Sequence, residues 1–68
     1  MTEEIQLTKR QREVLELIAD GKTTKQVAYT MKIAQRTVMA HLSDLKKKLG
    51  AETRAHAVML AVRKGWLQ

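Results

Sequence analysis

The chain has 68 residues and a net charge of +6, and it contains no cysteine, proline or phenylalanine. This length accommodates one domain, residues 1–68, and the lack of cysteine excludes a disulfide framework and thiolate chemistry. No apolar run reaches the ~20 residues that span a bilayer, and the acidic N-terminus excludes a signal peptide, so we expect a cytoplasmic protein that does not enter a membrane.

The first predicted helix covers residues 8–20. Thr8 and Gln11 have the spacing of a capping box, in which each side chain bonds a backbone N–H group at the start of the helix. Gly21 ends the helix because glycine adopts the left-handed conformation at little cost. The apolar stripe that would face the core consists of Val14, Leu15 and Ile18.

The second predicted helix covers residues 24–31 and begins with another capping box, formed by Thr23 and Gln26. Ile33, in the short connection that follows, is predicted to plug the core, and Tyr29 is predicted to be a packing residue. The short buried face of this helix consists of Val27, Ala28 and Met31.

The third predicted helix covers residues 35–49 and stops at Gly50. At 100° per residue, its apolar positions fall within about 60° of one another and form a core stripe. These positions are Val38, Leu42, Leu45 and Leu49. The opposite face carries Arg36, Ala40, Ser43 and Lys47, with Met39 and Lys46 on one flank.

Positive charge concentrates around this third helix. Residues 23–50 hold six Lys and Arg but one acid, Asp44, whereas residues 1–22 carry a net charge of −1. A solvated helix face more often interleaves Glu with Lys at four-residue spacing, and here the Glu partners are missing. The pattern therefore favours a face for a polyanion over a plain solvated face.

The outward residues of the third helix suit the major groove of duplex DNA. Ala40 and Ser43 are small enough for close approach, and Arg36 can reach a base edge or a phosphate. Lys46 and Lys47 would neutralise backbone charge, while Lys48 is predicted to lie along the surface near the edge of the core.

The fourth predicted helix covers residues 54–64, after Thr53 and before Gly65. It is apolar nearly all round, and in so short a chain it cannot all be buried internally. An exposed apolar strip indicates a partner helix, so we expect self-association; core packing of the whole helix and a heterologous protein partner are the alternatives. The strip consists of Ala55, Val58, Met59 and Val62.

These elements predict an all-α fold, a compact four-helix domain in which the second and third helices form a central helix-turn-helix. The first member would cross the DNA backbone and the basic second member would enter the major groove. Residues 1–6 are predicted to form a flexible arm, and residues 66–68 to be frayed. Backbone N–H groups at the start of the first member would point at a phosphate, beside Thr23, Thr24 and Lys25.

Other chemistries lack support in the sequence. Tyr29 and Trp66 are the only aromatic residues, and Trp66 is predicted to pack, so stacking on single-stranded nucleic acid is disfavoured. His41 and His56 have no ligand cluster, so we expect no metal, no cofactor and no small-molecule ligand. No nucleophile or carboxylate partner is placed for His41 to act as a catalytic base, which argues against an enzyme. A half-buried packing residue and a donor to a DNA phosphate are both open interpretations of His41.

The sequence resembles the LuxR-type helix-turn-helix domains, with matching motifs in the same order and spacing over nearly the whole chain. The matching pieces are Leu7-Thr8, Arg10, Glu13-Val14-Leu15, Thr23-Thr24-Lys25-Gln26-Val27-Ala28, Thr37-Val38, His41, Lys48-Leu49-Gly50, Arg54 and Ala57-Val58. Within the family, the chain is most similar to members that consist of this domain alone.

The resemblance implies a DNA-binding domain of four helices that dimerises through the fourth helix and reads DNA with residues 35–48. By position, the implied DNA contacts are Gln35, Arg36, Met39, Ala40, His41 and Ser43 from the third helix, and Thr23, Thr24 and Lys25 from the second.

The chain departs from the family pattern at several of these positions. Ala34 stands where the family has Ser or Thr, so the third helix lacks a side-chain cap, which typically costs about 1 kcal/mol. Met39 replaces a common Lys or Arg and could touch a thymine methyl group instead of a phosphate. Asp44 replaces a common Asn and would repel phosphate, and Gln11 replaces an acid that often pairs with an arginine.

The sequence therefore predicts a cytoplasmic, nucleoid-associated transcription regulator that binds a pseudo-palindrome in double-stranded DNA as a homodimer. RNA polymerase or another regulator would be a further partner. The alternative hypothesis is a protein-interaction module that binds another LuxR-type regulator through the fourth helix. The promoter-binding end of a sigma factor is disfavoured by the glycine stop and the extra helix. If Met1 is the native start, we expect the activity to be regulated through the abundance of the protein or through a partner. If the chain is instead the output domain of a larger regulator, that expectation does not apply.

Overall fold

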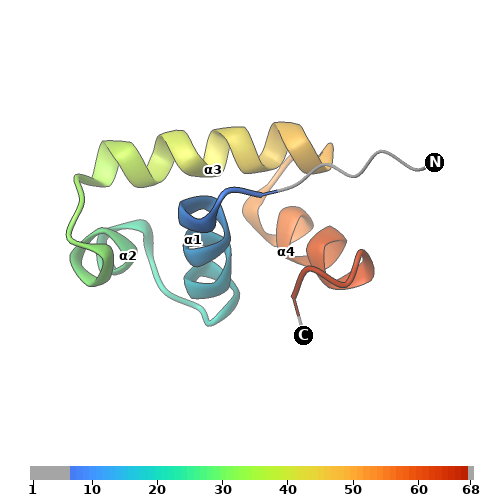
Figure 1. Ribbon diagram of the computed structural model, residues 1–68, viewed down its shortest axis with the longest axis horizontal. Coiled ribbons are helices and arrows are strands. Elements are labelled where there is room, and N and C mark those ends of the chain that lie inside the picture. The colour runs from blue at the N-terminus through green and yellow to red at the C-terminus, as the bar shows by residue number, and fades with distance from the viewer. Residues whose placement is uncertain (1–6, 68) are drawn as a thin grey trace.

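The computed structural model describes residues 7–67, which contain four α-helices and no strand. Figure 1 shows α3 lying across the other three, with α1 under its middle and α2 and α4 under opposite ends. The predicted all-α fold is confirmed, and each helix boundary differs from the prediction by at most one residue. The predicted arm of residues 1–6 lies outside the described residues. The helices are α1 (Lys9–Ala19), α2 (Thr24–Met31), α3 (Gln35–Leu49) and α4 (Arg54–Arg63).

The starts of α1 and α2 are fixed by the two predicted capping boxes. In α1, the Gln11 N–H donates to Thr8 Oγ1 at 3.1 Å, and Gln11 Oε1 accepts from the Thr8 N–H at 3.1 Å. In α2, the Gln26 N–H donates to Thr23 Oγ1 at 3.1 Å, and Gln26 Oε1 accepts from the Thr23 N–H at 2.9 Å. Each box satisfies two backbone N–H groups that an α-helix leaves without intrahelical partners.

The other helix ends follow the predicted residues. Ala34 gives α3 no side-chain cap, whereas Thr53 Oγ1 accepts from the His56 N–H at 3.0 Å and caps α4. Gly50 ends α3 with a left-handed φ of 72°, and its N–H bonds the last turn. Between α2 and α3, Lys32 holds the left-handed conformation as a non-glycine residue, with φ 59°. This residue makes the tight turn of the helix-turn-helix.

Gly50→Ala is expected to lower the free energy of unfolding by about 1 kcal/mol, because the left-handed conformation costs an L-residue about 1–2 kcal/mol. An added Cβ would meet no atom within 4 Å, so the loss would come from backbone strain alone. Urea unfolding measures the change. Gly50→Asn is the matched variant, since asparagine tolerates this conformation and should recover part of the loss. An alanine variant as stable as wild type would contradict the role of this glycine.

The core forms where the apolar stripes of the four helices meet. The predicted stripe of α3 is buried throughout, and Ala57 and Ala61 bring α4 against it. Leu67 is 9% exposed and joins this core, and Trp66 packs against it, so the predicted fraying at residues 66–67 is wrong. The core contains Val14, Leu15, Val27, Ala28, Val38, Leu42, Leu45, Ala61 and Leu67.

A polar contact links α1 to α3 at the edge of this core. Gln11 is 6% exposed, and its Oε1 accepts from Lys48 Nζ at 2.7 Å while also serving the α1 capping box. Lys48 therefore turns toward α1 at the edge of the core, as predicted. The Thr8 N–H and Lys48 Nζ both donate to the buried Gln11 Oε1, so both lone pairs of this oxygen have a hydrogen-bond partner.

Tyr29 differs from its prediction as a packing residue. The side chain is 86% exposed. On α2 the buried positions are Val27 and Ala28, and one further step of 100° carries Tyr29 out of the core stripe. The aromatic character of the residue suggested burial, but the helix turns the ring to solvent.

Candidate nucleic-acid interface

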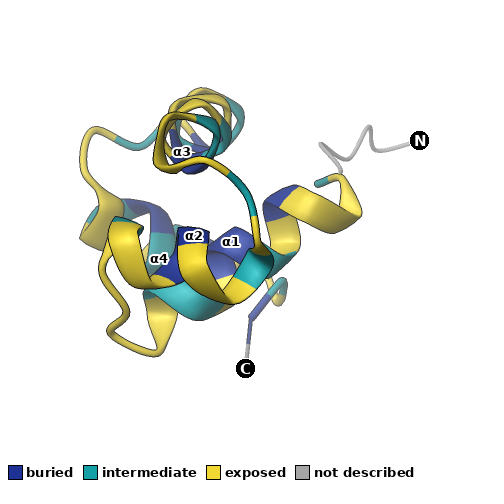
Figure 2. Cartoon of the chain, turned by 90° about the vertical axis from the view of Figure 1, so that its left-hand side faces the viewer, coloured by how far each residue is buried: buried dark blue, intermediate teal, exposed yellow. Residues whose placement is uncertain are grey.

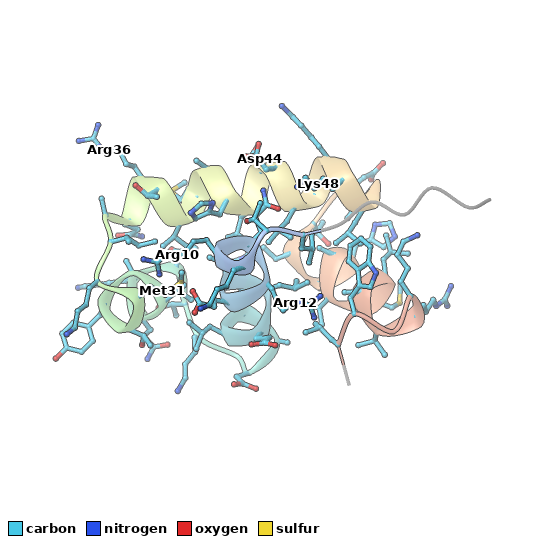
Figure 3. All side chains as sticks on the ribbon, viewed as in Figure 1. Arg10, Arg12, Met31, Arg36, Asp44 and Lys48 are labelled. Carbon is cyan, nitrogen blue, oxygen red and sulfur yellow. The ribbon has the colours of Figure 1, made fainter. Side chains whose placement is uncertain are left out.

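The outward face of α3 is the broad exposed surface that the third helix was predicted to present. Figure 2 shows the exposed side of α3 facing away from the other three helices. In Figure 3, Arg36 and Asp44 point away from the body of the protein. The exposed residues along this helix include Gln35, Arg36, Met39, Ala40, Ser43, Asp44 and Lys47.

A groove runs beside this face and brings three helices together. Thr24 comes from α2 and Arg54 from α4, and between them lie residues of α3. Gln35 Nε2 donates to Thr24 Oγ1 at 2.9 Å, which fixes the start of α3 against the start of α2. The residues of α3 that line the groove are Met39, Leu42, Ser43 and Lys46.

The start of α2 presents polar groups at one side of this groove. The Thr23 hydroxyl is used in the capping box, and the Thr24 hydroxyl accepts the bond from Gln35. Lys25 is exposed beside them. Because the first N–H groups of an α-helix have no intrahelical acceptors and carry partial positive charge, this turn suits an anion.

Acidic residues are distributed unevenly over the described structure, whereas basic residues occur on all four helices. No Asp or Glu occurs from Gly21 to Ser43, a segment that supplies α2 and the first half of α3. Glu13, Glu16 and Asp20 lie instead on α1 or at its end. There, Arg10 Nη1 and Glu13 Oε1 form an exposed ion pair at 3.3 Å, of a kind that contributes little to stability. This distribution leaves α3 with four Lys and Arg residues and one acid, Asp44.

His41 lies apart from the other predicted third-helix residues. It follows Met39 by two positions, which turns its side chain about 200° around the helix axis. His41 is half-buried and shares its flank of α3 with Lys48, seven residues further on. The groove that holds Met39, Ser43 and Lys46 does not include it. The phosphate contact implied for His41 stays a prediction.

Arg54 lines the groove, although the sequence argument assigned it no contact role. It is the first residue of α4 and is exposed. The family pattern singled out this arginine, but no periodicity within one helix could show that the start of α4 lies beside Ser43 and Lys46. The tertiary packing of α4 against α3 makes the connection.

The apolar strip predicted on α4 is largely exposed. Met59 is 45% exposed, Val62 is 50% exposed, Ala55 is exposed and Val58 is half-buried against the core. The small residues Ala57 and Ala61 instead turn inward.

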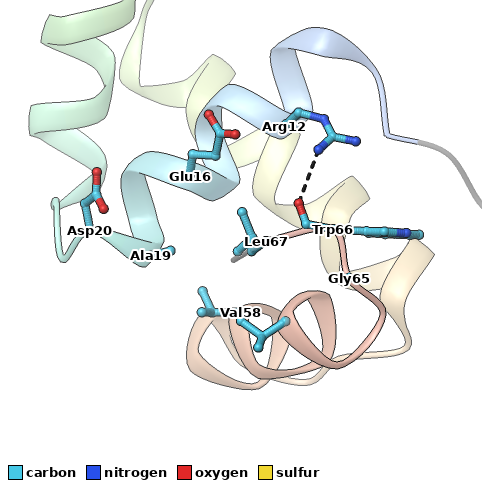
Figure 4. Close-up of a pocket in the computed structure, with 9 residues that line it drawn as sticks. Arg12, Glu16, Ala19, Asp20, Val58, Gly65, Trp66 and Leu67 are labelled. Carbon is cyan, nitrogen blue, oxygen red and sulfur yellow. Dashed lines mark hydrogen bonds between the residues drawn. The ribbon is translucent and has the colours of Figure 1, made fainter.

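An open groove with a volume of about 680 Å³ separates part of this strip from α1 (Figure 4). Across it, Arg12 Nη1 donates to the Trp66 carbonyl oxygen at 3.2 Å. The groove is lined by Arg12, Glu16, Ala19, Asp20, Val58, Val62, Gly65, Trp66 and Leu67.

Neither a metal-binding cluster nor a membrane-spanning helix is found among the described residues. Within residues 7–67, His, Cys, Asp and Glu side chains never gather in groups of three or more that could hold a metal ion. In the same part of the chain, every helix is too short or too polar to cross a membrane.

The amino-acid sequence is similar to those of known bacterial regulatory proteins. Residues 5–61 match the family model described as bacterial regulatory proteins, luxR family. The chain is 45% identical over 62 residues to the spore germination protein GerE of Bacillus subtilis, and this alignment covers 91% of the chain and 84% of GerE. It is 42% identical over 62 residues to the transcriptional regulatory protein DesR of Bacillus subtilis, covering 91% of the chain but 31% of DesR.

Solved structures show the same likeness. The transcription factor GerE has a TM-score of 0.88 and 33% identity, and the match covers 97% of both chains. A Vibrio cholerae VqmA–ligand–DNA complex has a TM-score of 0.86 and 33% identity, and the match covers 97% of this chain and 29% of VqmA. The predicted likeness to a family member of similar length is confirmed by GerE.

Proposed function

Because the chain belongs to the luxR family of bacterial regulatory proteins, we propose that it regulates transcription by reading a pseudo-palindromic duplex site as a homodimer. In this proposal α3 enters the major groove, and the start of α2 contacts the backbone of one strand. The observation that carries the proposal is the acid-poor surface that runs from Thr24 along α3 to Arg54.

The proposed base-reading residues lie on the exposed face of α3. Arg36 is near the start of the helix, where recognition helices contact base edges, and its guanidinium can bond the two acceptors of a guanine. Ala40 and Ser43 have small side chains that project little from this face, so the helix can approach the bases closely. Gln35 is held toward Thr24, which favours a role in positioning or in a backbone contact.

The proposed backbone contacts surround these residues. Lys46 and Lys47 follow on α3, and Lys25 stands at the start of α2. Each lysine that meets a phosphate releases counterions, so binding should weaken steeply as salt rises. Asp44, which projects from the same helix (Figure 3), opposes this attraction locally.

Met39→Ala is expected to remove a preference for thymine over deoxyuracil at one position of the half-site. Met39 is 58% exposed in the groove, and its thioether can cover a thymine methyl group. Burial of one methyl contributes about 0.8 kcal/mol, or about fourfold in affinity. Fluorescence anisotropy with thymine and deoxyuracil duplexes measures the preference. Lys47→Ala should keep it, and a Met39→Ala variant that also keeps it would contradict the contact.

We propose that the dimer forms through α4. Met59 and Val62 are exposed apolar side chains, and exposed Ala55 on the same helix would let a second helix approach closely. A twofold axis at α4 would present two copies of α3 to half-sites about one turn of DNA apart. The exposed strip also suits a different luxR-family regulator, which would make the chain a protein-interaction module.

Selection from a random duplex library at moderate salt tests the proposed function. Recovery of a pseudo-palindrome with half-sites about 34–36 Å apart is the expected result for a dimeric reader of sequence. Recovery of nothing above background would reject sequence-specific binding and leave the interaction module as the function to pursue. Recovery of a single half-site would retain DNA reading and reject the dimer.

A further inference from the structure

We infer that Arg54, at the start of α4, holds a DNA phosphate at the far side of the groove from the start of α2. The inference rests on the proposed function and adds a residue from a third helix to its contacts. Thr24 of α2 and Arg54 of α4 line one groove, although α2 and α4 lie under opposite ends of α3 (Figure 1). A strand seated in this groove would meet both.

The backbone around Arg54 is firmly placed. Thr53 caps α4 through the His56 N–H at 3.0 Å, and the Glu52 N–H donates to His56 Nδ1 at 3.3 Å. The Ala51 N–H donates to the Lys46 carbonyl oxygen at 2.8 Å, so the connection is tied back to the last turn of α3. These bonds set the first residue of α4 close to Lys46 without using the Arg54 side chain.

The groove carries two cations, and this charge favours an anion. Lys46 and Arg54 both line it, and among the residues that the structure describes no acid does so. Two cations that face one groove repel each other, and a phosphate between or beside them relieves that repulsion. A guanidinium also suits a phosphate because its fixed fork can donate two parallel hydrogen bonds.

The groove is long enough to make this contact separate from those at α2. Met39 and Lys46, which both line the groove, are seven residues apart, or about 10 Å along α3. This length exceeds the distance of about 3.4 Å of helix axis per phosphate on one DNA strand. A phosphate at Arg54 is therefore a different phosphate from one at the start of α2. The losses of binding free energy caused by substituting Lys25 and Arg54 should then add, as free-energy changes do for sites without shared partners.

Arg54→Gln in the full chain tests the inference against the selected duplex at 50 to 200 mM salt. Each protomer of the proposed dimer loses one phosphate contact, so the slope of log affinity against log salt should fall by about 1.8, or about 0.9 per contact, and affinity should fall about ten- to hundredfold. The duplex with permuted half-sites should lose affinity equally, because a phosphate contact carries no sequence information. Arg54→Lys retains the charge and should keep the wild-type slope.

Arg63→Gln is the matched control. Arg63 is exposed at the last position of α4, so its substitution removes the same positive charge at a site outside the groove. An Arg54→Gln slope equal to that of Arg63→Gln would overturn the inference while leaving DNA binding intact. A wild-type chain that binds no duplex would overturn the proposed function and the inference together. Circular dichroism at each step confirms that the exposed substitutions leave the helices folded.

Discussion

Val62→Asp is expected to convert the proposed dimer to monomers and to lower affinity for a duplex with two half-sites by about 10²–10⁴-fold. Val62 is 50% exposed on α4, so the monomer tolerates the change, whereas a second α4 packed over it would bury an unpaired carboxylate. The loss is large because linked binding makes the second half-site contact intramolecular. Light scattering gives the mass, and anisotropy gives the affinity.

A duplex with one half-site is the control for this variant. Wild type and Val62→Asp should bind it with nearly equal affinity, because α3 is unchanged; the added negative charge is the only difference. Val62→Thr, which adds no charge, should weaken the dimer less. A Val62→Asp protein that remains dimeric and keeps its advantage on two half-sites would show that the interface lies elsewhere.

Arg36→Ala is expected to lower affinity for the selected duplex by about 1–3 kcal/mol per half-site, or about 5- to 150-fold for each, while lowering affinity for random duplex much less. The reason is that a bidentate bond to one base pair discriminates against the others. The measurement is the ratio of the two affinities at fixed salt. Arg36 projects from α3 into solvent (Figure 3), so the domain should remain folded.

Lys47→Ala separates base reading from charge. It removes one positive charge from the same face of α3, and it should weaken selected and random duplexes alike and flatten the salt dependence. Should both variants bind selected DNA as wild type does, α3 would not be the element in the groove. Equal losses for both duplexes with Arg36→Ala would instead make Arg36 a backbone contact.

The helix boundaries were predictable because their signals are local. A threonine and a glutamine three residues apart decide a capping box within one turn, and both boxes form. Gly50 terminates α3 by its own conformational freedom. The core stripe of α3 was equally predictable, since a period of 3.6 residues selects one face. None of these inferences needed knowledge of a neighbouring helix.

The remaining features depend on how the helices meet. The α4 sequence is apolar nearly all round, so periodicity could not select its inner face; packing buried the small Ala57 and Ala61 and left Met59 and Val62 outside. The burial of Leu67 and the place of Arg54 beside α3 also arise from tertiary contacts.

The shared amide of Gln11 has a kinetic consequence. Its oxygen closes the first turn of α1 and accepts the Lys48 ammonium from the last turn of α3, with donor–acceptor distances of 3.1 and 2.7 Å. Fraying of α1 at its start therefore removes one contact that Lys48 makes at the far end of α3, which couples the two helix ends. Gln11→Ala is therefore expected to speed deuterium exchange at the start of α1 and also in the last turn of α3, although 37 residues separate Gln11 from Lys48 in the sequence.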